Sequence, residues 1–190
     1  VGHPIVMLYD EVLSGKRVAG RGVAVIGAGG IGFDVAEYLS TPAQGDELAQ
    51  FMEAWGVDRS GTVGGGLIQP APRGAAREVT ILQRKPAPAG KTLGLTTGWA
   101  LKAGLAQRGV KIITGAQYVR IDDQGLHYLQ DGKPALLAVD NVVLCAGQES
   151  ARGLYDELMA LGGQASVTVV GGAKRAAELD ALYAIDQGMR

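Results

Sequence analysis

The chain has 190 residues, of which 47% are hydrophobic, 5% are aromatic and 30 are glycine; this composition suits an α/β sheet with tight turns better than a β-sandwich or a helical bundle. Its formal net charge is -1 and it contains no long basic run, which argues against a surface for nucleic acid or for an anionic membrane. No apolar run approaches the roughly 20 residues that span a bilayer and no basic-then-apolar leader is present, so we expect a soluble, cytoplasmic protein.

The first segment, residues 1–20, is predicted to be a connector that arrives from another domain, with a short helix near residues 9–14. His3 precedes a proline, which is typical of a turn residue, although a histidine can also serve as a ligand or a base. Because the chain begins at valine and enters in the middle of a pattern, we expect it to be a fragment of a longer protein.

A strand that runs into a glycine-rich turn is the central motif of the sequence. Residues 22–26 include four consecutive apolar residues, three of them β-branched, as in a strand buried on both faces of a parallel sheet. The glycines that follow permit a tight turn, a close approach of the backbone to a pyrophosphate, and close packing of the next helix, residues 30–39, whose N-terminus would face the phosphates. The predicted dinucleotide contacts are Gly27, Ala28, Gly29, Gly30, Ile31 and Gly32. The alternative is a glycine-rich βα turn in another kind of α/β protein.

Residues 41–77 are an insertion, because a dinucleotide fold usually reaches its second strand after a few residues. Within it, residues 46–55 have the apolar spacing of a short amphipathic helix, whereas residues 61–74 are too rich in glycine and proline for regular structure. Long loops of this kind are usually functional or mobile.

The second strand, residues 78–82, is followed by Gln83, Arg84 and Lys85, at the place where NAD-binding proteins carry an acid for the ribose 2′-hydroxyl. An acid would repel a 2′-phosphate, whereas the two cations attract it, so Arg84 and Lys85 predict NADPH rather than NADH. The alternative for these residues is a solvated basic loop tip.

The next elements are predicted as a helix that begins at Thr96 or Thr97 and runs to Gln107, and a strand over residues 110–113. Together with the preceding elements they form a β-α-β-α-β unit. Three short strands follow, separated by turn residues, and we expect an antiparallel meander with His127 on its surface. The three strands are predicted at residues 117–121, 125–129 and 135–139.

Residues 141–147 are predicted as another buried strand that ends in a small-residue turn. Cys145, the only cysteine, excludes an internal disulfide, a zinc site of several thiolates and a cysteine-ligated iron–sulfur cluster within this chain, and it is expected to be a core thiol. Beyond it we predict a helix near residues 154–161, a strand at 167–170, a turn at Gly171 and Gly172, and a helix over 175–187. The expected domains are therefore the connector (1–20), a Rossmann-like domain (21–145) and the closing segment of a second domain (146–190).

Several stretches together resemble the NADPH domain of two-dinucleotide-fold flavoproteins, and most narrowly the C-terminal part of the bacterial 2,4-dienoyl-CoA reductases, relatives of Old Yellow Enzyme. The matching stretches are His3-Pro4 with residues 9–13, then residues 25–34, 82–85, 96–99, 140–149 and 178–181. The resemblance implies a Rossmann-like parallel sheet with a β-meander, plus a C-terminal remnant of the FAD domain. It also implies cofactor contacts at Ala146 and Gly147 and an edge of the FAD site at Gly171 and Gly172. Relatives often have an acid after this glycine pair, whereas here Ala173-Lys174 follow, which puts flavin contacts at that point in doubt.

The same resemblance implies a longer enzyme in fatty acid β-oxidation, with a barrel that carries FMN and a 4Fe-4S cluster, followed by an FAD domain. Hydride would pass from NADPH to FAD, and electrons would pass through the cluster to FMN and then to a dienoyl-CoA. The expected partners of this chain are NADPH and the rest of its own polypeptide. The alternatives are a non-enzymatic NAD(P) sensor, for which the insertion would be a partner surface, and the same domain of a related enoate or amine flavoenzyme. A self-contained dehydrogenase is disfavoured, because the sequence has neither the Tyr-x-x-x-Lys pattern of the short-chain type nor the ligands of the zinc type.

Overall fold

The computed structural model describes residues 2–42, 47–70, 74–91, 93–162, 166–176 and 181–190 of the chain. The chain forms two compact units, Val1–Ala146 and Gly147–Arg190, and each is described by itself. The first 20 residues, expected as a connector, contribute a strand and a helix to the first unit. None of the described helices combines the length and the apolar character needed to cross a membrane.

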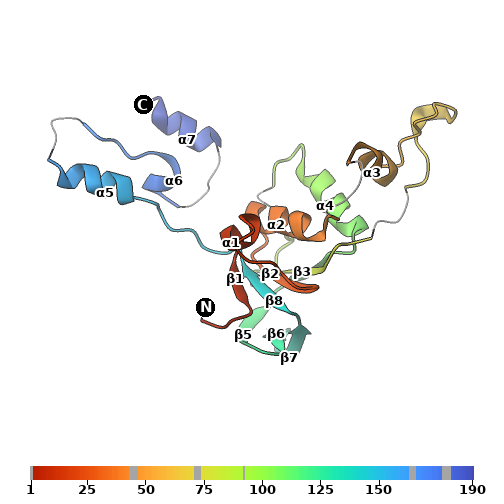
Figure 1. Cartoon of the computed structure of the whole chain (residues 1–190), viewed down its shortest axis with the longest axis horizontal. Coiled ribbons are helices and arrows are strands. Elements are labelled where there is room, and N and C mark those ends of the chain that lie inside the picture. Colours follow the sequence, from red (N-terminus) through yellow and green to blue (C-terminus); the bar gives the residue numbers. More distant parts are fainter. Residues whose placement is uncertain (1, 43–46, 71–73, 92, 163–165, 177–180) are drawn as a thin grey trace. The chain divides into compact units, whose positions relative to one another are not determined.

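A sheet of five parallel strands, counted over the described residues, forms the middle of the first unit (Figure 1). In spatial order the strands are β1 (Val6–Leu8), β8 (Asn141–Leu144), β2 (Gly22–Ile26), β3 (Glu78–Gln83) and β4 (Lys111–Thr114). All four pairings between neighbours are parallel, and β2 lies in the middle. The predicted α/β fold with a parallel sheet and a meander is thereby confirmed.

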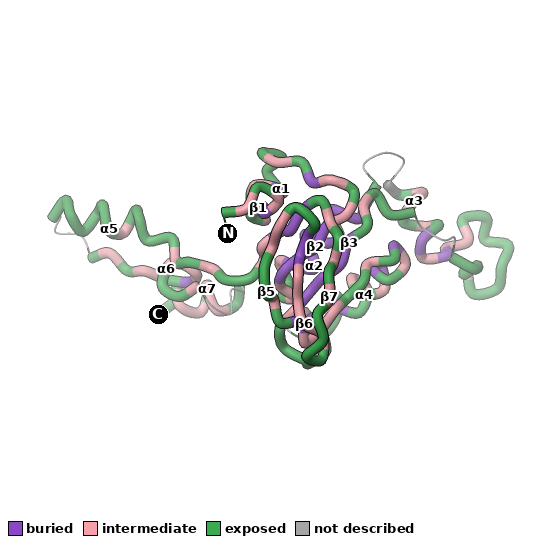
Figure 2. Tube along the Cα trace, turned by 90° about the horizontal axis from the view of Figure 1, so that it is seen from below, coloured by how far each residue is buried: buried purple, intermediate pink, exposed green. Residues whose placement is uncertain are grey.

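Three helices cover one face of this sheet. They are α1 (Tyr9–Leu13), α2 (Gly30–Ser40) and α4 (Gly98–Gln107). Alternate strand residues such as Val23, Val25 and Ile81 point toward these helices and pack against Phe33 of α2 and Leu105 of α4. Figure 2 shows the buried residues concentrated along β2, β3 and α2. The glycine turn between β2 and α2 is thus held by the best-packed part of the unit.

The antiparallel meander covers the other face of the sheet. It consists of β5 (Gln117–Asp122), β6 (Gly125–Gln130) and β7 (Lys133–Ala138), so the predicted meander is confirmed. The intervening strand residues, among them Ala24, Ile26 and Leu82, face this layer and pack with Leu126 and Tyr118. Burial on both faces explains why the inner strands β2, β3 and β8 are largely apolar instead of alternating between apolar and polar residues.

The insertion carries the predicted helix, here α3 (Glu47–Ala54), and a single turn of 3-10 helix, η1 (Gly64–Gly66). An isolated bridge between Val57 and Leu67 closes a loop beyond α3. Trp55 connects the insertion to α4, because its ring lies 5.9 Å from that of Trp99 in an edge-to-face arrangement. A cavity of about 390 Å³ lies between α2, α3 and α4 and includes Arg108, whose guanidinium is hydrogen-bonded to Ser40 and to Glu37.

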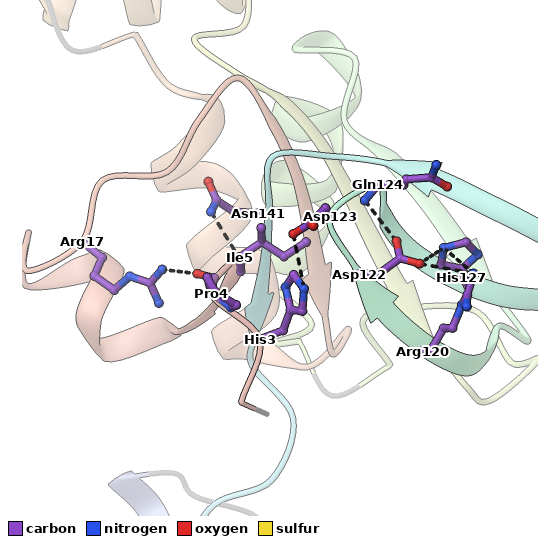
Figure 3. Close-up of polar contacts among 10 residues, drawn as sticks. All are labelled: His3, Pro4, Ile5, Arg17, Arg120, Asp122, Asp123, Gln124, His127 and Asn141. Atoms are coloured by element: carbon purple, nitrogen blue, oxygen red, sulfur yellow. Dashed lines mark hydrogen bonds and ion pairs between the residues drawn. The ribbon is translucent and has the colours of Figure 1, made fainter.

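Polar contacts attach the N-terminal segment to the rest of the first unit (Figure 3). The side-chain amide of Asn141 in β8 donates a 3.4 Å hydrogen bond to the carbonyl of Ile5, and Nε2 of His3 lies 3.5 Å from a carboxylate oxygen of Asp123 in the β5–β6 turn. Within the segment, Arg17 donates a 2.6 Å hydrogen bond to the carbonyl of Pro4. In the meander, Nε2 of His127 lies 2.8 Å from Asp122, and this hydrogen bond is the main reason that the pKa of Asp122 is lowered. Both histidines therefore have structural partners, as expected of a turn residue and a sheet-surface residue.

The second unit contains α5 (Gly153–Ala160), α6 (Gly171–Lys174) and α7 (Ala181–Gly188), and the first of these confirms the helix predicted near residues 154–161. The strand predicted at residues 167–170 is wrong: the segment forms no strand, because no described strand of this unit lies beside it to share hydrogen bonds. The predicted turn at Gly171 is instead the start of α6. Of the helix predicted over 175–187, Arg175 is extended, residues 177–180 lie outside the described residues, and the helix is present from Ala181 onward.

Candidate functional site

The candidate site lies at the carboxyl edge of the parallel sheet. Because β2, β3 and β8 are parallel, the residues that follow them meet at the same edge: Gly27 follows β2, Arg84 follows β3 and Ala146 lies two residues beyond β8. The chain leaves β2 toward β3 and β4 on one side and later returns as β8 on the other side. Ligands of open α/β sheets bind in the crevice at such a reversal of strand order.

A cleft of about 320 Å³ opens at this edge. It is lined by Gly27, Ala28, Gly29, Gln83, Arg84, Lys85, Ala87, Pro88, Gly90, Lys91, Tyr118 and Ala146. The structure thus brings together six of the predicted cofactor contacts, namely Gly27, Ala28, Gly29, Arg84, Lys85 and Ala146. Of the other six, Gly30, Ile31 and Gly32 form the first turn of α2, and Gly147, Gly171 and Gly172 belong to the second unit.

The three glycines of the turn differ in what surrounds them. A Cβ on Gly32 would lie 1.8 Å from the carbonyl oxygen of Gly27, so this glycine allows the helix to pack against the end of the strand. Gly27 has a φ of +120° and lies against the backbone of Cys145, which again excludes a side chain. A Cβ on Gly29 would meet nothing within 4 Å, so the middle of the turn has open space on its outer side.

The N-terminus of α2 has no internal capping group. No side chain caps it at Gly29, and its first turn contains no acidic residue. The amides of Gly30, Ile31 and Gly32 have no acceptor within the helix, because the first intrahelical donor is Phe33, which bonds to the carbonyl of Gly29. Unsatisfied amides and the positive end of the helix dipole favour a bound anion.

Three cationic side chains and no described carboxylate line the cleft. Arg84 and Lys85 are exposed at the end of β3, and Lys91 is exposed across the loop that follows. None of the three forms an ion pair with a carboxylate in the part of the chain that the structure describes. A cleft that combines open glycine backbone, a helix N-terminus and three positive charges fits a phosphorylated dinucleotide.

Tyr118 of β5 is a lining residue that the sequence analysis did not single out. Its hydroxyl donates a 3.0 Å hydrogen bond to the carbonyl of Leu82, and burial raises its pKa to about 12, opposed by the nearby charge of Arg84. The phenol is therefore neutral and fixes the meander against the end of β3. Alternating hydrophobicity along the meander could have indicated that Tyr118 faces the sheet, but not that it reaches the cleft.

Gly171, the first glycine of the pair predicted for a flavin, makes contacts within the second unit. Gly171 is buried, a Cβ on it would lie 3.1 Å from Cβ of Ala184, and its amide donates a 2.8 Å hydrogen bond to the side chain of Gln187. A flavin contact through this amide would require Gln187 to move. In the described arrangement the amide of Gly171 is therefore occupied by Gln187.

Cys145 is predicted to be chemically inert. The thiol packs against the helix-side core, and burial raises its pKa to about 12. At pH 8 about one thiol in 10⁴ would then be ionised, against about a quarter for an unperturbed cysteine, and the thiolate is the reactive form. We expect iodoacetamide to alkylate the native chain at least about 100-fold more slowly than the urea-unfolded chain. Because Cys145 is the only cysteine, total thiol labelling measures this directly, and equal rates in the two states would contradict the burial.

Comparison with known proteins gives a family match and a set of structural neighbours. Residues 8–185 match the sequence profile of the pyridine nucleotide-disulphide oxidoreductases. A metal reductase of Desulforamulus reducens is 25% identical over 158 residues, which make up 83% of this chain and 23% of that protein.

Among solved structures, a 2-naphthoyl-CoA reductase in complex with 2-naphthoyl-CoA has a TM-score of 0.65 at 20% identity, over 95% of this chain and 22% of the other. The 6-hydroxypseudooxynicotine amine oxidase of Pseudomonas geniculata N1 has a TM-score of 0.64 at 21% identity, over 92% and 22%. At these identities the two structures establish a shared fold. The chain spans less than a quarter of the length of each of these three relatives.

Proposed function

The chain belongs to the pyridine nucleotide-disulphide oxidoreductase family, and on that premise we propose that its cleft binds NADPH for hydride transfer to a flavin held elsewhere in a longer polypeptide. One observation carries this proposal: the open glycine turn shares a single cleft with Arg84 and Lys85, and no described carboxylate lines it. An NADH-selective cleft would need an acid for the ribose 2′-hydroxyl at the end of β3.

Each part of the cleft has a separate task in this proposal. The turn at Gly29 leaves room for the pyrophosphate, and the free amides of α2 hold it by hydrogen bonds and by the helix dipole. Arg84 and Lys85 hold the 2′-phosphate at the end of β3. Bound nicotinamide supplies a hydride, and this chain contributes the binding and orientation of its carrier.

For the longer polypeptide we propose an enzyme of the 2,4-dienoyl-CoA reductase type, in which an FAD domain and a barrel with FMN and a 4Fe-4S cluster complete the electron path. The support is the set of sequence stretches that resemble those reductases, from the glycine turn through residues 140–149 to residues 178–181. A related amine-oxidising flavoenzyme is the second candidate, because the amine oxidase of P. geniculata shares the fold as fully as the naphthoyl-CoA reductase does.

Isothermal titration calorimetry of the 190-residue chain with NADPH and NADH tests the coenzyme assignment. We expect NADPH to bind at least about tenfold more tightly, because each charge-assisted bond to its extra phosphate contributes about 1.5–3 kcal/mol. Equal dissociation constants for NADPH and NADH would overturn the role of Arg84 and Lys85. If neither coenzyme binds, the dinucleotide site itself is overturned. A second assay, on the full-length protein, measures NADPH oxidation with a dye as electron acceptor. It distinguishes an enzyme from a non-enzymatic sensor, because a sensor would bind NADPH without oxidising it.

A further inference from the structure

The three cations of the cleft lie at two separate places along one loop, and we infer that the two places serve different phosphates. The loop runs from the end of β3 toward α4, with Arg84 and Lys85 at its start and Lys91 near its middle. On this inference, which rests on the proposed function, Lys91 binds the pyrophosphate that all nicotinamide dinucleotides share. Arg84 and Lys85 bind the 2′-phosphate that only NADPH carries. Lys91 then contributes affinity without selectivity.

The middle of the loop is fixed to the glycine turn at Gly90. The amide of Gly90 donates a 3.2 Å hydrogen bond to the carbonyl of Ala28, so Lys91 is one residue from a direct contact with the phosphate-binding turn. Gly90 is buried with a φ of +68°, and a Cβ on it would lie 2.7 Å from Leu93 and 2.8 Å from Lys102. The positive φ favours glycine at this position, and the hydrogen bond to Ala28 fixes the backbone from which the Lys91 side chain extends.

The near end of the loop is fixed to the end of β3 instead. The side-chain amide of Gln83 donates to the carbonyls of Lys85 and Ala87, and the amide of Gly115 donates a 3.2 Å hydrogen bond to the carbonyl of Lys85. Arg84 and Lys85 therefore stay with the strand end, where the adenosine ribose lies in a Rossmann-like site. The two cationic positions are held apart by hydrogen bonds rather than by flexible side chains alone.

The pyrophosphate needs a charge that the turn itself does not supply. It carries two negative charges, whereas a helix N-terminus provides about half an elementary positive charge. No basic side chain lies in the first turn of α2. Of the three basic residues that line the cleft, Lys91 is the one next to Gly90, which bonds to the turn, whereas Arg84 and Lys85 directly follow β3. A lysine binds phosphate as a point charge and needs no fixed two-pronged geometry, which suits an exposed side chain beside a diphosphate.

Binding of four ligands distinguishes the two phosphate positions. NADPH carries both the pyrophosphate and the 2′-phosphate, NADH and ADP carry only the diphosphate, and 2′-AMP carries only the 2′-phosphate. We expect Lys91→Gln to raise the dissociation constants of NADPH, NADH and ADP by similar factors, about tenfold each, and to leave that of 2′-AMP unchanged. Titration calorimetry of the 190-residue chain gives all four constants. Lys111→Gln is the matched control, because Lys111 is also exposed and lies on β4 outside the cleft, and it should change none of them.

The outcomes separate this inference from the proposed function. If the unmodified chain binds NADPH more tightly than NADH while Lys91→Gln changes none of the constants, the role of Lys91 is overturned and the proposed function stands. The proposed role of Lys91 is also overturned if Lys91→Gln weakens the binding of NADPH and 2′-AMP only, because Lys91 would then bind the 2′-phosphate. If the unmodified chain binds none of the four ligands, the proposed function and the inference both fail. Matching circular dichroism and thermal transitions for the variant and the unmodified chain confirm that both are folded.

Discussion

Arg84→Glu is expected to abolish the preference for NADPH over NADH. The dissociation constant of NADPH should rise about 100-fold, whereas that of NADH should change less than about threefold. The substitution removes a cation that lines the cleft at the end of β3 and places a carboxylate where NAD-specific proteins carry one. That carboxylate would repel the 2′-phosphate of NADPH but could accept a hydrogen bond from the 2′-hydroxyl of NADH. Calorimetric titration of both coenzymes, at one fixed salt concentration because salt screens these charges, measures the effect.

The control for this variant is Arg59→Glu, which makes the same charge change at an exposed residue of the insertion that does not line the cleft. It should leave both dissociation constants within about twofold, because Arg59 does not line the cleft and salt screens the interaction between exposed charges. If Arg84→Glu weakens NADPH and NADH by the same factor, Arg84 contacts a group that the two coenzymes share. If it changes neither constant, the basic residues after β3 are a solvated loop tip.

The parallel sheet was predictable because its strands are buried on both faces. Burial on both faces gives residues 23–26, 79–82 and 142–144 a largely apolar sequence without a polar residue at every second position, a signal that needs no knowledge of the neighbouring strands. The glycine turn was equally readable, because the close contact of Gly32 with Gly27 allows no side chain and so leaves a mark in the sequence. Signals of this kind are local, because each depends only on the residues that form the element.

What the sequence analysis missed depends on partners far along the chain. Val6–Leu8 looked like part of a connector because three apolar residues carry no period, and they become a strand only by pairing with residues 142–144. Residues 167–170 have a clear strand composition and remain unpaired, because a β-branched run forms a strand only beside another strand. Helix α2, by contrast, makes its hydrogen bonds within itself and was predicted to within a residue.

The cleft shows the same division. The residues that directly follow a strand, such as Gly27 and Arg84, could be predicted because parallel strands bring their carboxyl ends together. Lys91 and Tyr118 reach the cleft through a loop fixed by the Gly90 to Ala28 hydrogen bond and through a second layer that covers the sheet. Neither arrangement produces a periodic pattern in the sequence. The sequence analysis therefore predicted two of the three cations of the cleft and missed Lys91.

Gly32→Ala is expected to destabilise the first unit by about 3 kcal/mol or more, because overpacking against an immobile neighbour is among the most costly single substitutions. The added Cβ would lie 1.8 Å from the carbonyl oxygen of Gly27, and that carbonyl belongs to backbone held by β2, so α2 must move away from the strand. Phe33 and Val35, which are fully buried on this helix, would lose part of their packing. Urea denaturation followed by circular dichroism measures the loss as a lower midpoint, and an unchanged midpoint would contradict the contact.

Gly29→Ala is the matched variant, since it adds the same methyl group three residues earlier in the same turn. The backbone at Gly29 is extended, with a φ of -90°, and a Cβ there would meet nothing within 4 Å, so stability should change by less than about 1 kcal/mol. Binding should change instead, because the methyl group occupies the space through which the pyrophosphate approaches the turn, and we expect NADPH and NADH to bind at least about tenfold more weakly. Loss of stability in Gly32→Ala together with loss of coenzyme binding in Gly29→Ala would show that the two glycines of this motif have different tasks. Gly32 permits the packing of α2, and Gly29 leaves room for the anion.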